Sequence, residues 1–378
     1  MKKRISILGS SGSIGVNALK IVRHLKDEFE VVALAAKSNI DVLEVQAKEF
    51  LPQIIGVLDP SKAVELKKRL PNFNIVGGEE GILECATWSA ADFVVSAISG
   101  FSGIKPTLAA IRKGKKIGLA NKEALVAAGH LVISLAKENN VEIIPIDSEQ
   151  SGVFQCLKGA SAEDVHRLVL TASGGPFFHA HISELSDVTV DKALCHPNYR
   201  MGTKVTIDSS TLMNKGLEMI EAHFLFGIPT EEIKVVVHPQ QIIHSFVEFK
   251  DGCIIAQMSE PNMLFPIQFA MTYPERKKSP LPHFDFTKHS LHFYQVDLQK
   301  FPCLDLAYGA IQAGGSMPCY MNAANEILVE RFLRREIHWL DISKKLEILM
   351  HKHDVQKNLN IEFLCSIDTE ARKEALTV

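Results

Sequence analysis

The sequence has no uninterrupted apolar run that approaches the length of a membrane-spanning helix. At the amino terminus, the charged start MKKR is followed by only a few apolar residues before the glycine- and serine-rich GSSGS, which is too little for a signal peptide. These two absences predict a protein that works in the cytoplasm and has no membrane partner.

An excess of charge of one sign is also missing. The chain contains 41 lysines and arginines against 44 aspartates and glutamates, which gives a formal net charge of −3 at pH 7. Nucleic acids and anionic membranes are bound through clustered positive charge, so this balance excludes both as expected partners. Any anion that the protein binds has to be held by a local site.

Cysteine is scarce and scattered. The seven cysteines are spread from Cys85 to Cys365, their number is odd, and no two of them have the C-x-x-C spacing. This distribution predicts free thiols in a reducing cytosol, rather than a disulfide framework or a zinc site built from thiolates.

The first 150 residues contain short β-branched runs that alternate with helical segments. RISIL, EVVALAA and ADFVVSA are typical of the runs, and IGVNALKIVRHL and IKPTLAAIRKG of the helical segments. The alternation predicts an α/β fold, with a Rossmann-like parallel sheet covered by helices on both faces. In such sheets, ligands collect at the carboxyl ends of the strands.

The pattern changes after Gly152. RLVLTAS, TKVTI, EIKVVVHP, IIHSFVEF and CIIAQMS are predicted to be strands, with a hairpin turn at Asp251 and Gly252, whereas the segments beyond about Phe301 are helical. We therefore predict an N-terminal sheet domain over 1–150, a central α+β catalytic domain over 151–275, a linker over 276–300 and a C-terminal helical bundle over 301–378.

Three glycines follow the first predicted strand and open the first predicted helix. Gly9, Gly12 and Gly15 are spaced G-x-x-G-x-x-G instead of the more usual G-x-G-x-x-G. Glycines in this place permit a tight turn and let a pyrophosphate approach backbone N–H groups at a helix N-terminus. The turn predicts a dinucleotide site; the alternative is a plain glycine-rich loop.

The end of the second predicted strand indicates which dinucleotide is bound. An NAD site usually has an acidic residue there to hold the ribose hydroxyls, but this chain has Lys37, Ser38 and Asn39. A cation and two hydrogen-bonding side chains suit a 2′-phosphate, which favours NADP. The alternative is that Lys37 is a solvated surface lysine.

Two acids, Asp147 and Glu149, follow the last predicted strand of the sheet domain, within PIDSE. In an extended chain, residues two apart point the same way, so the two carboxylates would converge. Carboxylates that close repel each other unless a proton or a cation lies between them, and oxygen ligands favour Mg²⁺ or Mn²⁺. The alternative is a helix-capping turn.

A third acid lies on the predicted helix in DSSTLMNKGLEMIEAHFLFG. Glu218 is four residues after Asn214 and three after Lys215, so the three share one helical face. The acid suits a metal, and the amide and the cation suit an anion; the alternative is a salt-bridged surface turn. Ser173 in TASGGPF and Ser209 offer further donors, and CHPNYRMG is a candidate lid.

These motifs together resemble one enzyme family over nearly the whole chain. GSSGSIG, LANKEAL, PIDSEQSGVFQCL, TASGGPF, HPNYRMG, DSSTLMNKGLEMIEAHFLFG, VVVHPQQIIHSFVEF and NAANE occur in that order. The combination is similar to the 1-deoxy-D-xylulose 5-phosphate reductoisomerases, which catalyse the first committed step of the methylerythritol phosphate route to isoprenoids. The resemblance implies an NADPH-dependent oxidoreductase and isomerase that acts as a homodimer on a small phosphorylated sugar.

The resemblance also implies a role for individual residues. It implies that the metal, Mg²⁺ or Mn²⁺, is held by Asp147, Glu149 and Glu218. It implies that the catalytic residues are Lys122, Glu149, His196 and His244. It implies that the substrate is bound by Lys122, Ser148, Glu149, Ser173, His196, Ser209, Asn214, Lys215 and Glu218. The cofactor residues are, by the resemblance, Ser11, Gly12, Ser13, Ile14, Asn39, Asn121, Glu123 and Gly202; the strand-end argument adds Lys37 and Ser38.

The chain departs from the family pattern at two places. The lid has Tyr199 where tryptophan is common, and Lys37 precedes Ser38 where the family often has glycine followed by a basic residue. Two other functions stay open at this point. One is an NADP-dependent sugar-phosphate dehydrogenase without skeletal change, which would need no carboxylate metal site. The other is a dinucleotide-sensing regulator without turnover.

Overall fold

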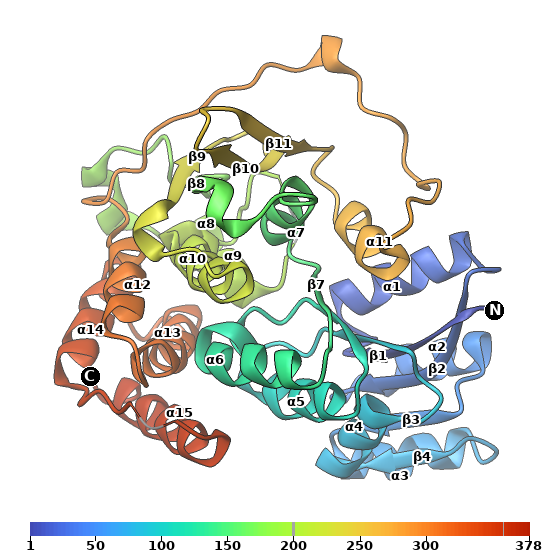
Figure 1. Cartoon of the computed structure of the whole chain (residues 1–378). Coiled ribbons are helices and arrows are strands. Elements are labelled where there is room, and N and C mark those ends of the chain that lie inside the picture. Colours follow the sequence, from blue (N-terminus) through green and yellow to red (C-terminus); the bar gives the residue numbers. More distant parts are fainter. Residues whose placement is uncertain (199–200, 358) are drawn as a thin grey trace. The chain divides into compact units, whose positions relative to one another are not determined.

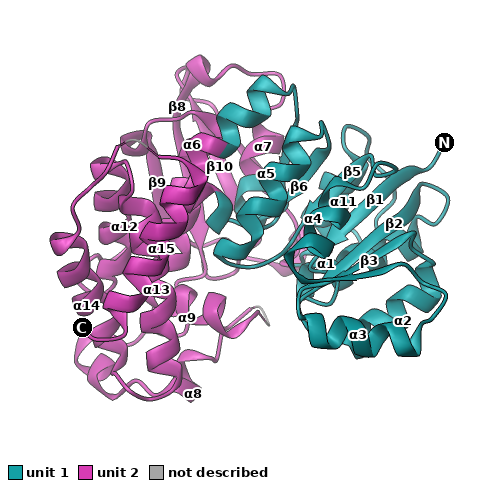
Figure 2. Cartoon of the chain, turned by 90° about the horizontal axis from the view of Figure 1, so that it is seen from below, with its two compact units in different colours: residues 1–124, 132–151, 262–283 teal, residues 125–131, 152–261, 284–378 magenta. Residues whose placement is uncertain are grey.

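The computed structural model describes residues 1–198, 201–357 and 359–378. Its contacts divide the chain into two compact units (Figure 2). Unit 1 comprises residues 1–124, 132–151 and 262–283, and unit 2 comprises residues 125–131, 152–261 and 284–378. Within the described residues, no helix combines the length and the apolar character that crossing a membrane requires.

Unit 1 is built on a seven-stranded sheet in the order β4-β3-β2-β1-β5-β6-β7, in which every recorded pairing is parallel. The strands are β1 (Lys3–Leu8), β2 (Phe29–Ala36), β3 (Ile54–Val57), β4 (Ile75–Gly77), β5 (Phe93–Ser96), β6 (Lys116–Leu119) and β7 (Ile143–Pro145). The predicted parallel sheet is confirmed. Of its strands, β3 and β4 are short and were not predicted.

Helices connect the strands of this sheet (Figure 1). They are α1 (Ser13–His24), α2 (Ile40–Phe50), α3 (Pro60–Arg69), α4 (Gly78–Thr87), η1 (Phe101–Gly103) and α5 (Ile104–Arg112), with α11 (Leu264–Thr272) added from later in the chain. The strand order reverses between β1 and β5. Because parallel crossovers are right-handed, the helices that follow β1 to β3 and the helix that follows β5 lie on opposite faces.

The apolar strands of unit 1 are buried because helices cover both faces of the sheet. Ile5, Ile7 and Leu8 in β1 are fully inaccessible to solvent, as are Val94 and Val95 in β5. Burying one such side chain contributes about 1.5–3 kcal/mol, and these strands need no polar face. This explains why the sequence has continuous apolar runs here instead of alternation.

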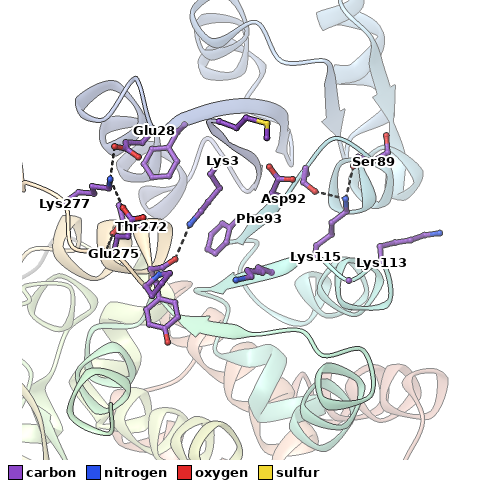
Figure 3. A pocket seen from close by; sticks show the side chains of 17 residues that line it. Lys3, Glu28, Ser89, Asp92, Phe93, Lys113, Lys115, Thr272, Glu275 and Lys277 are labelled. Atoms are coloured by element: carbon purple, nitrogen blue, oxygen red, sulfur yellow. Dashed lines mark hydrogen bonds and ion pairs between the residues drawn. The ribbon is translucent and has the colours of Figure 1, made fainter. Parts of the chain in front are cut away.

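A cavity of about 590 Å³ lies at the amino ends of β1, β2, β5 and β6 (Figure 3). Lys3 Nζ donates to the carbonyl of Met271 at 2.7 Å, and Lys115 Nζ donates to that of Ala91 at 2.6 Å. Lys277 pairs with Glu28 at 2.9 Å. Lys3 thus ties the start of β1 to the end of α11, and the other two lysines tie loops together. The cavity lies at the opposite ends of the strands from the glycine turn.

Unit 2 contains a four-stranded mixed sheet in the order β11-β10-β8-β9. The strands are β8 (Val165–Ala172), β9 (Ile233–Val237), β10 (Ile243–Phe249) and β11 (Ile254–Met258). The predicted hairpin between β10 and β11 is confirmed: the strands are antiparallel, and Gly252 has a φ of +85° in the turn. β8 and β9 are parallel, and Tyr294 bridges to Val237 at the outer side of β9.

Helices make up most of the rest of unit 2. They are α8 (Val190–Ala193), α9 (Thr203–Thr211), α10 (Met213–Phe226), α12 (Pro302–Ala313), α13 (Met317–Leu333), α14 (Trp339–Lys352) and α15 (Ile361–Ala375), with short 3-10 turns η2 (Ala162–Asp164), η3 (Ile182–Asp187), η4 (Thr230–Glu232) and η5 (Phe286–Lys288). Two helices contain residues of both units: α6 (Glu123–Glu138) and α7 (Ser148–Cys156). The predicted C-terminal helices are confirmed.

One predicted strand is wrong. TKVTI forms the first part of α9, which runs from Thr203 to Thr211 with Gly202 as its N-cap. The last four residues of α9, from Asp208 to Thr211, are polar and at most 8% exposed. The β-branched residues suggested a strand, but the packing of these buried polar residues against other helices decides the local structure.

Candidate active site

The glycine turn lies where the strand order of unit 1 reverses. Gly9, with a φ of +84°, follows β1 and lies so close to Ala97 after β5 that a Cβ would meet the Ala97 carbonyl. A Cβ on Gly15 would meet the backbone of Gly9 and Ser10. Only glycine permits these approaches, and the strand-order reversal at β1 and β5 is where dinucleotides bind in such sheets.

The surroundings of this turn fit a dinucleotide. Gly12 is the N-cap of α1 and provides no side-chain hydrogen bond to the first turn of the helix, so backbone N–H groups there suit a phosphate. Ser11 and Ile14 are partly exposed, and Gly12 and Ser13 are exposed. Beyond β2, the predicted residues Lys37, Ser38 and Asn39 are also exposed, and Asn39 caps α2 by accepting from Val42 N.

Asn121, predicted to line the cofactor, is buried and engaged with the protein. Its Oδ1 accepts from Ala124 N at 2.7 Å, and its Nδ2 donates to the carbonyl of Gly100 at 2.9 Å and also to that of Ile98. The side chain therefore joins the start of α6 to the loop after β5. The neighbouring Glu123 is 6% exposed.

The carboxyl ends of β6 and β7 bring Lys122 and Asp147 together. Lys122 Nζ lies 2.8 Å from Asp147 Oδ2, and the two side chains are 11% and 12% exposed. β7 ends at Pro145 and α7 begins at Ser148, so Asp147 and Glu149 lie at a strand-to-helix junction. The expected extended geometry at this point is wrong. Asp147 Oδ1 accepts from Glu149 N at 3.3 Å, as the capping alternative predicts.

Glu149 and Ser148 continue this site on the first turn of α7. Glu149 is 5% exposed, and its Oε2 accepts a hydrogen bond of 2.7 Å from Ser148 Oγ. A buried carboxylate is costly unless hydrogen bonds or cations compensate it. The serine hydroxyl supplies part of that compensation.

Glu218, the third predicted acid, lies on α10, in unit 2. It is 1% exposed; Asn214 Nδ2 donates to its Oε1 at 2.5 Å, and Lys215 Nζ pairs with its Oε2. The predicted shared face of these three residues is confirmed, and the surface-turn alternative is excluded because all three are at most partly exposed.

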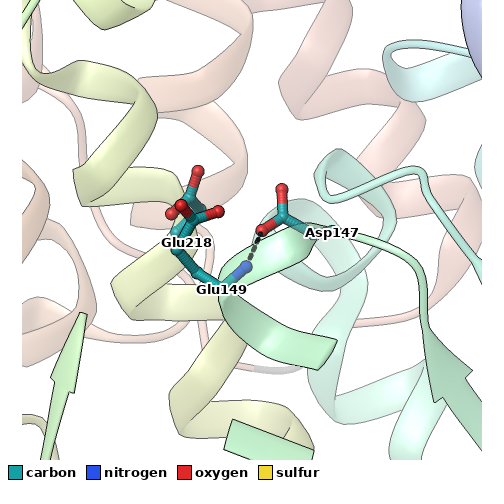
Figure 4. Close-up of side chains that lie close together, drawn as sticks. All are labelled: Asp147, Glu149 and Glu218. Carbon is teal, nitrogen blue, oxygen red and sulfur yellow. Dashed lines mark hydrogen bonds between the residues drawn. The ribbon is translucent and has the colours of Figure 1, made fainter. Parts of the chain in front are cut away.

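Asp147, Glu149 and Glu218 offer one ligand atom each, and these atoms lie within 4.8 Å of one another (Figure 4). Oxygen donors without histidine or thiolate fit a hard divalent cation such as Mg²⁺. Three carboxylates this close repel one another in the absence of compensating positive charge. The chemistry of the donor set therefore fits the predicted metal.

The loop after β8 packs closely against α9. Gly174 and Gly175 both have positive φ angles, and a Cβ on Gly175 would lie 2.7 Å from the carbonyl oxygen of Ser209. Ser173 Oγ accepts from Gly175 N at 3.1 Å and lies 2.9 Å from His196 Nε2. The predicted residues Ser173 and His196 are in contact, and Ser209 lies beside their loop.

His196 is uncharged near neutral pH. Burial, and then the positive charge of Lys215, lower its pKa from 6.5 to about 4. Its Nδ1 accepts from Asn198 N at 3.2 Å, which fixes the ring. Of the rest of the predicted lid, Gly202 is exposed at the start of α9, and Tyr199 lies outside the described residues.

His244 lies in β10 and is 3% exposed, with its Nε2 3.0 Å from Ser259 Oγ. Sequence reasoning missed another buried polar residue, Asp208, which is 1% exposed and immediately precedes Ser209. Its place between a predicted strand and a phosphate-type serine was the available signal, but nothing in the sequence indicates its burial.

A doubly wound sheet with a glycine turn at its switch point, together with a carboxylate group suited to a hard cation, defines a metal-dependent dinucleotide oxidoreductase. Comparison with known proteins identifies the family. The family model of 1-deoxy-D-xylulose 5-phosphate reductoisomerase matches residues 5–129. A model of the C-terminal domain of this enzyme matches residues 143–226, and a second model of a C-terminal domain of the same enzyme matches residues 258–374.

Relatives at full length support the same assignment. The 1-deoxy-D-xylulose 5-phosphate reductoisomerase of Protochlamydia amoebophila is 54% identical over 99% of this chain and 97% of its own length, and that of Acetivibrio thermocellus is 51% identical over 99% and 98%. The chain belongs to the 1-deoxy-D-xylulose 5-phosphate reductoisomerase family.

Solved structures agree with the fold. The reductoisomerase of Zymomonas mobilis in complex with NADPH is 40% identical, covers 99% of this chain and 98% of that chain, and has a TM-score of 0.94. A second structure, of a reductoisomerase with NADPH, fosmidomycin and magnesium, is 39% identical over 99% and 97%, with the same TM-score of 0.94.

The chain is thus an NADP-dependent oxidoreductase of isoprenoid biosynthesis. With NADPH and a divalent metal it rearranges and reduces 1-deoxy-D-xylulose 5-phosphate to 2-C-methyl-D-erythritol 4-phosphate, a step of the methylerythritol phosphate pathway. The simple dehydrogenase and the regulator without turnover are excluded by this assignment.

Proposed function

We propose that Asp147, Glu149 and Glu218 bind the divalent cation of this reaction, and that the residues around them bind the reacting end of the sugar. The observation that carries the proposal is the approach of the three carboxylates to within 4.8 Å of one another. A bound Mg²⁺ or Mn²⁺ would supply Lewis-acid stabilisation of the charge that develops on the substrate oxygens.

Lys122 and Ser148 act beside these carboxylates. The ammonium group of Lys122, 2.8 Å from Asp147 Oδ2, can donate to a substrate oxygen. The Ser148 hydroxyl orients Glu149 through a hydrogen bond of 2.7 Å.

In the reaction, one C–C bond of the sugar breaks, another forms, and a branched aldehyde results. Hydride from NADPH then reduces its carbon while its oxygen takes a proton, leaving NADP⁺.

The phosphate of the substrate is held in unit 2 by donors from two loops and two helices. Ser173 and His196 come from the loops after β8 and α8, Ser209 from α9, and Asn214 and Lys215 from α10. Neutral His196 donates one N–H here while its other nitrogen accepts from Asn198. Because the phosphate is remote from the bonds that change, its binding energy helps to order the reacting end. His244 is a further catalytic residue.

NADPH is held by the glycine turn, the end of β2 and the residues at the start of α6 in unit 1, with one further residue at the start of α9. The residues are Ser11, Gly12, Ser13, Ile14, Lys37, Ser38, Asn39, Asn121, Glu123 and Gly202. The glycine turn at β1 and β5 supports this assignment.

The test is an NADPH-oxidation assay with 1-deoxy-D-xylulose 5-phosphate, with and without a chelator. We expect turnover that stops with chelator and returns with Mg²⁺ or Mn²⁺, and that is lost in Glu149→Gln. The same variant should bind NADPH as the unaltered chain does. Full turnover in Glu149→Gln with metal dependence retained would contradict the ligand assignment.

We propose that the protein is a homodimer that pairs through the edge strand β11. Ile254 and Ile255 in this strand are 59% and 48% exposed, and β11 is the last strand at one side of its sheet. An exposed apolar edge strand favours pairing with a second copy. In sedimentation, Ile255→Lys should give monomers while Val45→Lys, at a 64% exposed position on α2, should leave dimers. Dimers in both variants would exclude this edge.

We also propose that fosmidomycin, which is present with magnesium in related structures, competes with the sugar phosphate here. Inhibition that is not relieved by excess substrate would contradict this.

A cytoplasmic location is proposed on the ground that all seven cysteines are free thiols, of which Cys195 and Cys253 are exposed. Enrichment of the enzyme in a membrane or secreted fraction would contradict that location.

A further inference from the structure

We infer that Asp208 and Asn325 are positioning residues that hold the phosphate-binding donors of α9 and α10 in register. The inference rests on the proposed phosphate site. Asp208 immediately precedes Ser209, while Asn325 lies on α13, 117 residues further along the chain. The pair therefore links the end of α9 to the C-terminal helices of unit 2.

The geometry of the pair is that of a buried, directional link. Asn325 Nδ2 donates to Asp208 Oδ1 at 2.8 Å, and Lys204 Nζ lies 2.8 Å from Asp208 Oδ2. Asp208 is 1% exposed and Asn325 is inaccessible to solvent. The Lys204 side chain is 25% exposed, so this ion pair is only partly buried and contributes little net stability. The link is better explained by the arrangement that it specifies.

The segment that the pair holds is strained. Between α9 and α10, Leu212 adopts φ +60° and ψ 9°, the left-handed region that a branched side chain rarely occupies. Such a conformation costs about 1–3 kcal/mol and persists only where the surroundings enforce it. This turn sets how Ser209, before it, lies relative to Asn214 and Lys215, after it.

Other contacts on both sides of Leu212 restrict the same turn. Trp339 Nε1, on α14, donates to Ser210 Oγ at 2.9 Å. On α10, a Cβ at Gly216 would meet the Cβ of Ala307, so α10 and α12 approach closely at that point. The Asp208–Asn325 bond adds the charged and directional contact next to the serine itself.

The test reverses the donor and the acceptor. Asn325→Asp places two carboxylates face to face, so we expect the substrate KM to rise about ten- to a hundredfold, as a displacement near 1 Å would cause. The KM for NADPH should stay within about twofold. In the double variant Asp208→Asn with Asn325→Asp, the new amide can donate to the new carboxylate, and the substrate KM should return to near its original value.

Two further variants make the outcome decisive. Asp368→Asn, which breaks a 2.7 Å ion pair with Arg372 on α15, is the matched control for lost helical-bundle stability and should leave the substrate KM unchanged. Lys215→Met tests the phosphate site itself. If Lys215→Met does not raise the substrate KM, the proposed phosphate site falls, and this inference with it.

The remaining outcomes concern the pair alone. If Lys215→Met raises the substrate KM but Asn325→Asp does so no more than Asp368→Asn, the positioning role is overturned while the phosphate site stands. The role is also overturned if Asn325→Asp raises both KM values equally, or if the folded double variant recovers none of the loss.

Discussion

The sheet of unit 1 and the α9–α10 segment of unit 2 differ in what they bury. β1 and β5 bury apolar side chains such as Ile7 and Val95, whereas α9 and α10 bury Asp208, Lys215 and Glu218, none more than 4% exposed. Apolar burial is non-directional and follows from the hydrophobic pattern. Buried charges need specific partners, and those partners come from distant parts of the chain.

This difference shows which groups of each region make up the proposed binding sites. In the sheet, the proposed cofactor site uses the backbone of the glycine turn and the strand ends. In the α9–α10 segment, the proposed metal and phosphate ligands are the buried side chains themselves. Substitutions that keep volume should therefore be tolerated in the strands but not in the helices.

The largest effect on turnover is expected from removing the charge of one of the three carboxylates Asp147, Glu149 and Glu218. Asp147→Asn or Glu218→Gln should lower metal-dependent turnover by more than about a hundredfold, since even indirect supports of a metal cost ten- to a hundredfold. NADPH affinity, measured by fluorescence titration, should be nearly unaltered. Glu231→Gln, at an exposed glutamate of unit 2, is the control. Unaltered turnover in Asp147→Asn or Glu218→Gln would break the metal-ligand assignment.

The next effect sharpens the case for the backbone of unit 1. Gly9→Ala should lower the free energy of unfolding by about 1–2 kcal/mol from its positive φ, with about 1–3 kcal/mol more from overpacking against Ala97. Gly78→Ala, at φ +81° with nothing within 4 Å of the new Cβ, should lose only the first part. Urea unfolding compares the two.

NADPH affinity completes that comparison. It should weaken in Gly9→Ala and not in Gly78→Ala, because only Gly9 lies in the dinucleotide turn. If both variants lose the same free energy of unfolding and bind NADPH equally well, the close approach of Gly9 to Ala97 matters neither for stability nor for NADPH binding.

A smaller effect tests the strand end of β2. Lys37→Ala should raise the KM for NADPH about tenfold, the range of one hydrogen bond to a charged group, and should change the KM for NADH little. Lys26→Ala, at another exposed lysine of unit 1, serves as the control. An equal rise in the KM for NADPH and the KM for NADH would show that Lys37 does not bind the 2′-phosphate.

The smallest effect concerns the pH dependence of stability. The pKa of His196 is about 4 in the folded protein against 6.5 ordinarily, so between these values the unfolded chain binds a proton that the folded protein does not. Stability is therefore lost as pH falls from about 6.5 to about 4. His196→Gln should weaken this loss in urea unfolding at pH 7 and pH 5. A constant difference between the two proteins at both pH values would contradict the neutral, buried imidazole.

Most of the fold could be predicted because it follows local patterns. The strands of unit 1 other than β3 and β4, the β10–β11 hairpin and the helices after Phe301 were predicted from runs and turns. TKVTI was predicted wrongly because its β-branched residues favour a strand, while the packing of Asp208 and Ser210 against α13 and α14 makes it a helix.

The candidate site was predictable in its residue types rather than in its geometry. The acids of PIDSE pointed to a cation, and MNKGLE placed Asn214 and Lys215 beside Glu218. The capping contact of Asp147 and the burial of Asp208 depend on tertiary structure, which no local pattern contains. Roles that rest on family resemblance alone, such as that of His244, stay predictions.

The most direct measurement of the central claim is anomalous X-ray diffraction from crystals of the full chain grown with Mn²⁺. We predict one manganese peak per chain within coordination distance of carboxylate oxygens of Asp147, Glu149 and Glu218. A manganese peak elsewhere, with none at these carboxylates in a form that still turns over substrate, would contradict the account.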